Sequence, residues 1–156
     1  LQRLMDPSQT GLNAQLAARP GLDAGLVVAH KAAIDIVARL RVTAQPLSLL
    51  TSETSLGQED YMSMAVPTIE RVFALCEQTT MLLAYELMAA AVALDQRDGR
   101  TGVDVHALHD LIRRDLPRLT QDRSPGPDVE NILSILSSAE FSGLLRLPHP
   151  TRWSAL

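Results

Sequence analysis

The strongest constraint on the fold is an apolar seam that runs through the middle of the sequence in steps of three and four residues. Its members are mostly apolar and recur without a break at Val66, Ile69, Phe73, Cys76, Thr80, Leu83, Leu87, Ala90 and Leu94. This spacing places them on one face of a helix. A helix that carries the whole seam has about 30 residues, well above the mean of about 11 or 12. We therefore predict one long helix that starts between Gln58 and Thr68, ends near Leu94, and buries its seam in a large bundle or a subunit interface.

The remaining patterns also favour helices. An apolar stripe between residues 22 and 40 predicts a second helix, which Pro46 stops because the residue before a proline avoids the helical region. Two shorter helices are predicted over residues 103–116 and 129–145. The rest is predicted to be loop, turn or irregular chain, namely residues 1–20, 46–57, 98–102 and 148–156. Because no convincing strand alternation is present, the predicted fold class is all-α, a bundle of long helices that forms a single domain over residues 1–156.

Composition supports helices and argues against several classes of partner. Hydrophobic residues make up 46% of the chain but aromatic residues only 3%, so that alanine and leucine, both good helix formers, supply the apolar surface. A net charge of −4 without a long basic run argues against nucleic acid. No apolar run approaches the roughly 20 residues that span a bilayer, so no membrane partner is expected. The single cysteine, Cys76, excludes an internal disulfide and is typical of a reducing compartment. We expect a cytoplasmic protein in which Cys76 packs as a small core residue.

The best candidate site in the sequence is Gln58-Glu59-Asp60, where two adjacent carboxylates stand at the entrance to the long helix. Carboxylates at a helix start also interact with the positive end of the helix dipole, so a purely structural role is the alternative. His106 and His109 lie three residues apart on a predicted helix and could bind a metal ion. With no third ligand nearby, a solvated helix face is the better interpretation, and we predict no metal site.

A wider pattern joins these segments. The string Gln58-Glu59-Asp60-Tyr61-Met62-Ser63-Met64-Ala65 resembles the Gln-Glu-Asp-His-Val-Ser-Met-Gly segment of histidine ammonia-lyase and its aromatic amino-acid lyase relatives. Further stretches resemble segments of the same family in the same order. They are Gln9–Leu16 with Pro20–Gly25, Thr51–Ser55, Leu83–Ala90, and Leu119–Arg123 with Pro127–Glu130. Together they extend over most of the chain, and their shared order makes the resemblance specific.

The resemblance implies an all-helical lyase that eliminates ammonia from an amino acid to give an α,β-unsaturated acid. In this family Glu59 and Gln58 would line the substrate pocket, where a carboxylate accepts a hydrogen bond from an imidazole N–H and favours histidine. The family's electrophile, methylidene-imidazolone, forms from an internal Ala-Ser-Gly, which this sequence lacks. The resemblance therefore implies the C-terminal third of a longer polypeptide, inactive alone, with no catalytic residue of its own, no cofactor and the electrophile upstream. It also implies self-association, since these lyases are homotetramers built on central helices.

Three interpretations stay open at this point. The chain is part of an ammonia-lyase, a non-catalytic helical oligomerisation module derived from that family, or an unrelated helical bundle that binds partner helices. The substrate is open as well, because Gly57, Tyr61, Met62 and Ala65 depart from the pattern of the histidine enzymes. An amino acid with another aromatic ring, such as phenylalanine or tyrosine, is equally compatible with these residues.

Overall fold

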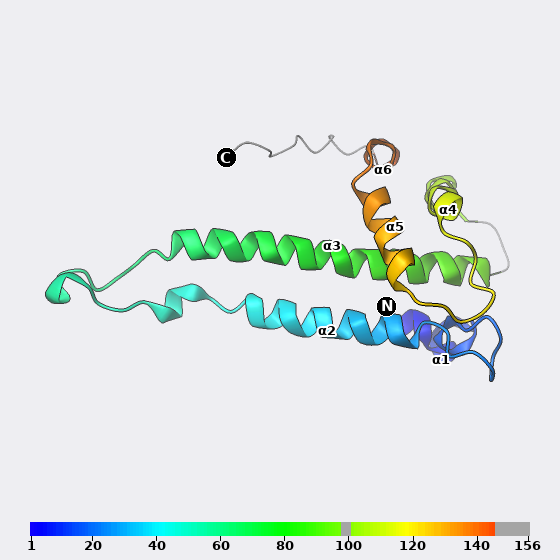
Figure 1. Ribbon diagram of the computed structural model, residues 1–156, viewed down its shortest axis with the longest axis horizontal. Coiled ribbons are helices and arrows are strands. Elements are labelled where there is room, and N and C mark those ends of the chain that lie inside the picture. Colours follow the sequence, from blue (N-terminus) through cyan, green and yellow to red (C-terminus); the bar gives the residue numbers. More distant parts are fainter. Residues whose placement is uncertain (98–100, 146–156) are drawn as a thin grey trace.

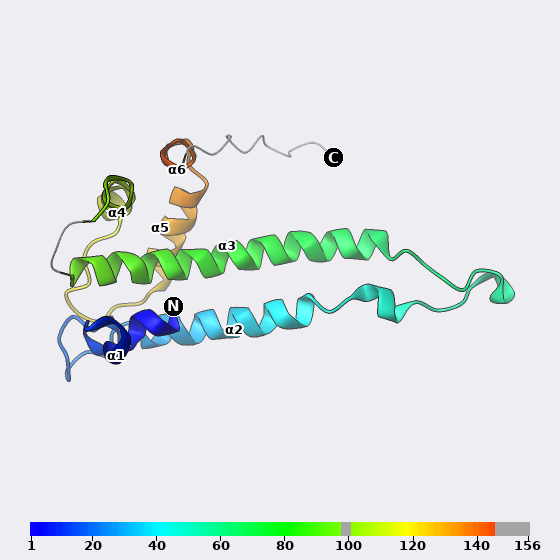
Figure 2. The same cartoon turned by 180° about the vertical axis from the view of Figure 1, so that it is seen from behind.

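Two long helices dominate the computed structural model, which describes residues 1–97 and 101–145. Helix α2 (Val27–Thr43) and helix α3 (Ala65–Asp95) lie side by side, and the chain reverses between them through the 44–64 segment (Figures 1 and 2). Helices α4 (Val103–Asp115), α5 (Gly126–Leu136) and α6 (Ala139–Leu144) gather beside the C-terminal half of α3. No strand occurs in the described part of the chain. The predicted all-α fold is confirmed.

The long helix was predicted closely. Helix α3 has 31 residues, starts at Ala65, inside the predicted window, and ends one residue beyond Leu94. Its sequence is rich in alanine and leucine and contains neither an internal glycine nor a proline beyond the first turn, so nothing interrupts its hydrogen bonds. Helix α4 also matches its predicted range within one residue.

The predicted helix over 129–145 is two helices. Helix α5 ends at Leu136, and Ser138 adopts an extended conformation with ψ 150°. Its hydroxyl accepts a hydrogen bond from the backbone N–H of Phe141 at 3.1 Å and thereby caps the start of α6. A serine side chain that bonds to the backbone competes with the hydrogen bonds of a continuous helix, which explains why the helix is interrupted here. The apolar periodicity alone did not reveal this interruption.

The N-terminal segment is more ordered than predicted. Residues 1–20 contain 3₁₀ turns at Gln2–Met5 and Ala14–Leu16 and a short helix α1 (Pro7–Thr10), and they bury Met5, Leu16 and Ala17. The side chain of Gln96 donates a hydrogen bond to the carbonyl of Leu16 at 2.9 Å, which ties this segment to the end of α3. Helix α2 starts at Val27 rather than at Leu22, whose side chain is 73% exposed.

The core lies against the C-terminal half of α3, where Leu87 of the predicted seam packs against it only partly buried. The buried residues of α3 are mainly small, namely Ala84, Met88, Ala89, Ala91, Val92 and Ala93. They pack with buried apolar residues of the N-terminal segment, α2, α4 and α5. Val66, Ile69 and Phe73 of the seam are instead 69%, 56% and 66% exposed. Cys76, predicted as a core residue, is also exposed. The core of this chain therefore does not bury the N-terminal half of the seam, and burial of that half in a subunit interface stays a prediction.

Two further expectations concern parts that the structure does not fully describe. The predicted irregular tail, 148–156, lies outside the described residues, as do residues 98–100 of the predicted 98–102 turn. Within the ranges 1–97 and 101–145, no helix is both long and apolar enough to cross a bilayer.

Candidate functional site

Gln58 and Glu59 lie in the segment that connects α2 to α3 and extends beyond the ends of both helices (Figures 1 and 2). Both side chains are exposed, as is that of Asp60. The segment is anchored at its base, where the guanidinium of Arg71 donates a hydrogen bond to the carbonyl of Gln45 at 2.8 Å. The candidate site thus projects away from the core instead of lining it.

A tight turn holds Glu59 in place. Its carbonyl oxygen accepts a hydrogen bond from the N–H of Thr54 at 2.6 Å, and its N–H donates to the carbonyl of Thr54 at 3.2 Å. The hydroxyl of Thr54 also donates to the Glu59 carboxylate at 3.3 Å. The intervening turn places Ser55, Leu56 and Gly57 at φ values of 54°, 59° and 84°. Only glycine adopts such angles freely, so Ser55 and Leu56 carry local backbone strain in the turn that positions Glu59.

This geometry separates the two interpretations of the carboxylates. Helix α3 begins at Ala65, and its first turn contains no acidic residue. Glu59 and Asp60 therefore do not act as helix-start carboxylates, and that structural alternative is wrong. An exposed carboxylate next to the Gln58 amide can accept a hydrogen bond from a polar ligand. A carboxylate becomes strongly selective only where another surface excludes water from it.

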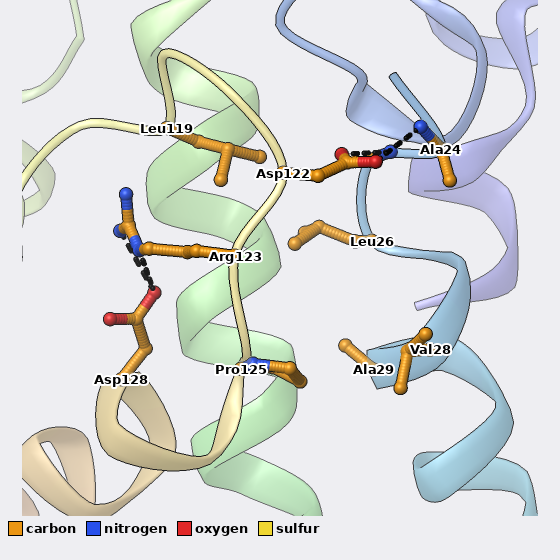
Figure 3. Close-up of a pocket in the computed structure, with 10 residues that line it drawn as sticks. Ala24, Leu26, Val28, Ala29, Leu119, Asp122, Arg123, Pro125 and Asp128 are labelled. Atoms are coloured by element: carbon orange, nitrogen blue, oxygen red, sulfur yellow. Dashed lines mark hydrogen bonds and ion pairs between the residues drawn. The ribbon is translucent and has the colours of Figure 1, made fainter.

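A second polar group lies near the start of α2, at the opposite end of that helix from Glu59 (Figures 1 and 3). Here the carboxylate of Asp122 accepts hydrogen bonds from the backbone N–H groups of Ala24 (2.7 Å) and Gly25 (2.8 Å). The next residue, Arg123, pairs with Asp128 at 2.8 Å and donates to the carbonyls of Pro117 and Arg118. The cavity that these side chains border is small, about 90 Å³.

These bonds fix the α4–α5 connection. The sequence analysis assigned no role to the residues that make them. Asp122, Arg123 and Asp128 belong to a stretch that carries the family resemblance, and that was the only signal pointing to them. Because both carboxylates are occupied by donors of the same chain, this group is a structural clamp.

The two histidines have different environments. His106 is exposed and lies 3.5 Å from Asp110. The side chain of His109 is only 13% exposed and lies 3.0 Å from Asp95, the last residue of α3. The interpretation of both as a solvated helix face is therefore wrong for His109. Within the described ranges no group of three or more metal-ligating side chains is found.

Fold and site together define a class of protein, an all-α chain built on an antiparallel pair of long helices with an exposed polar loop between them. The sequence model of the aromatic amino acid lyase family matches residues 1–114. The chain therefore belongs to the histidine and aromatic amino-acid ammonia-lyase family.

Individual relatives agree with this assignment. The chain is 31% identical over 147 residues to a histidine ammonia-lyase of Stigmatella aurantiaca, an alignment that covers 94% of this chain and 29% of the relative. The crystal structure of histidine ammonia-lyase from Trypanosoma cruzi superposes with a TM-score of 0.85 at 28% identity, over 94% of this chain and 30% of that one. The crystal structure of a tyrosine aminomutase from Streptomyces globisporus superposes with a TM-score of 0.81 at 27% identity, over 93% of this chain and 28% of that one. The chain thus spans less than a third of each of these relatives.

Proposed function

We propose that this chain forms the Glu59-bearing part of an amino-acid ammonia-lyase and that it completes its substrate pocket with polypeptide outside this sequence. One observation carries the proposal. Gln58 and Glu59 are held by a defined turn on a segment that projects from the helical body, so that their polar groups are free to face another surface. The relatives support the proposal, because they are lyases and an aminomutase that are about three times longer than the aligned region.

In this proposal Glu59 binds the substrate's ring. Its carboxylate accepts a hydrogen bond from an imidazole N–H, and Gln58 offers an amide that can donate or accept beside it. A carboxylate enclosed without a donor is costly, so the same residue disfavours a purely apolar ring. These properties favour histidine or another polar ring as the substrate.

The electrophilic group of the family does not fit within this chain. Methylidene-imidazolone forms from Ala-Ser-Gly, and the 156 residues contain no such tripeptide. We propose that this group is supplied by the polypeptide that completes the site. The part played by this chain is then to bind and orient the substrate, with no catalytic residue of its own, and the chain alone releases no ammonia from histidine, phenylalanine or tyrosine.

We also propose that the chain self-associates, and that it does so in the cytoplasm. The exposed apolar side chains of the long helices support the first statement, because a surface of this kind is a frequent subunit contact. Exposed Cys76, the only cysteine, supports the second, because it fits a reducing compartment.

The test joins this chain to the preceding segment of the Trypanosoma cruzi histidine ammonia-lyase and compares kcat/KM on histidine and tyrosine. Glu59→Gln should lower kcat/KM on histidine by about ten- to a hundredfold and spare tyrosine, because a bond to a charged acceptor contributes about 1.5–3 kcal/mol. Asp60→Asn is the matched control, since it removes the neighbouring exposed charge. Equal substrate preference in the parent chimera and the Glu59→Gln variant would show that Glu59 does not bind the ring.

A further inference from the structure

A second charged site lies at the end of α3 that is distant from Glu59 (Figure 1). The carboxylate of Asp95 is only 10% exposed and lies 2.7 Å from Arg113, 3.0 Å from His109 and 3.5 Å from Arg118. Asp95 thus faces two permanent positive charges and a histidine. The exposed carboxylate of Asp110 lies 4.0 Å from His109 and 3.5 Å from His106, so the excess of positive charge comes from the arginines and not from the histidines.

A cavity of about 230 Å³ opens beside this cluster. Hydrogen-bond donors surround it from three parts of the chain. Arg97 follows α3, Thr101 precedes α4, His106 and His109 lie on α4, and Arg118 lies in the α4–α5 connection. Asp95 is the only carboxylate among the described residues that line it. The lining is therefore rich in donors and cationic side chains.

Arg113 contacts Asp95 without lining the cavity and adds a third arginine to the surroundings of this carboxylate. Its side chain is 11% exposed, and burial lowers the pKa of its guanidinium against the opposing effect of Asp95. The neighbouring charges of Arg118 and Arg123 lower it further. In addition, its Nε is buried without a hydrogen-bond acceptor in the described part of the chain. An added negative charge nearby would stabilise this arrangement.

We propose that the cavity between the end of α3, the start of α4 and Arg118 binds a tetrahedral oxyanion, either inorganic phosphate or a phosphate monoester. The donors approach from several directions, as the four oxygens of such an anion require. Arg118, which is 69% exposed, is free to turn from Asp95 toward the ligand. The site is separate from the Glu59 segment and does not depend on lyase chemistry.

The test is a calorimetric titration of the chain with sodium phosphate, and separately with phosphoserine, against sodium chloride of equal ionic strength. The imidazole NMR signals of His106 and His109 report whether binding occurs in this cavity. We expect saturable binding with shifts in both signals. Binding of phosphate but not of phosphoserine would identify a site for the free anion. Binding of both would identify a site that is open to monoesters. Either result supports the proposal.

Variants make the test specific. Arg118→Gln and Arg97→Gln should each weaken phosphate binding by about tenfold or more, because each removes a charge-assisted donor. Arg39→Gln is the control, because it removes the same charge from an exposed arginine of α2 that pairs with Asp35. Binding no stronger than that of chloride, or equal loss in all three variants, would overturn the site and leave the cluster as an ion-pair network that holds α4 on α3. Neither result would bear on the role of Glu59.

Discussion

The carboxylate of Asp122 lies 2.8 Å from the backbone nitrogen of Gly25, although 97 positions separate the two residues in the sequence. Its other oxygen accepts from the N–H of Ala24 (Figure 3). Two backbone donors that precede α2 are satisfied by a side chain from the α4–α5 connection. This contact joins the N-terminal part of the fold to its C-terminal helices.

Asp122→Asn should therefore destabilise the protein. The amide has one acceptor oxygen in place of two, and its NH₂ group would face a backbone N–H. We expect the free energy of unfolding to fall by about 1.5–3 kcal/mol, as for the loss of a bond to a charged acceptor. Urea unfolding followed by circular dichroism measures it. Glu130→Gln, on the exposed side of α5, is the control and should change stability by less than about 0.5 kcal/mol. An equal effect of the two substitutions would contradict the clamp.

Gly25→Ala should be more damaging. Gly25 has φ +64°, and a β-carbon there would contact the carbonyl of Gln15 and lie 2.7 Å from the nitrogen of Ala17. Backbone strain and overpacking together should lower the free energy of unfolding by about 2–4 kcal/mol. Gly11→Ala separates the two effects, because Gly11 has φ +70° with no atom within 4 Å of the added carbon. Gly11→Ala should lower the free energy of unfolding by only about 1 kcal/mol. Thermal unfolding of both variants measures the difference, and similar costs would rule out a close approach at Gly25.

The sequence predicted the helices well and their buried faces poorly. The extent of α3 followed from periodicity, because three- and four-residue steps continue over its whole length. The buried face of α3 did not follow from periodicity. Ala84, Ala89 and Ala93 are buried because they allow close approach of neighbouring elements, whereas bulky Phe73 is exposed. In an alanine-rich helix, side-chain size at the contact decides which face packs, and periodicity does not record it.

The candidate site was likewise predictable from the sequence only in part. Glu59 could be singled out from its neighbours in sequence, yet its position on a projecting turn depends on the φ values of Ser55 and Leu56, which no propensity predicts. The pairing of Asp95 with His109 links α3 to α4 through their relative packing. Contacts between elements of this kind are not encoded in the spacing of either helix, so they become visible only in the fold.

Acid should weaken the fold partly through Asp23. Hydrogen bonds from the Arg19 guanidinium, at 2.9 and 2.6 Å, hold the pKa of this carboxyl below its ordinary value. A carboxyl whose pKa is lower in the folded state stabilises the protein above its unfolded pKa, about 3.9 for aspartate, and that stabilisation is lost as the pH falls toward the folded value. Between about pH 5 and pH 2, Tm should therefore fall less steeply in Asp23→Asn than in the parent. Hydrogen bonds from Ser8 lower the pKa of Asp6 likewise, so some acid dependence should remain. Identical slopes would refute a contribution from Asp23.

The exposed seam of α3 leads to the final prediction. Val66, Ile69 and Phe73 are more than half exposed on the half of the helix that projects from the core. Burying them against a second copy would remove this apolar area from water, at about 25 cal/mol per Å². We expect dimers or larger species at micromolar concentration, measured by sedimentation velocity. Ile69→Glu with Phe73→Glu should weaken association by at least about tenfold, because it places charges in the contact. Val103→Glu, at an 85% exposed position of α4, should leave association unchanged. A monomeric parent protein, or equal weakening by Val103→Glu, would show that the seam is not the contact.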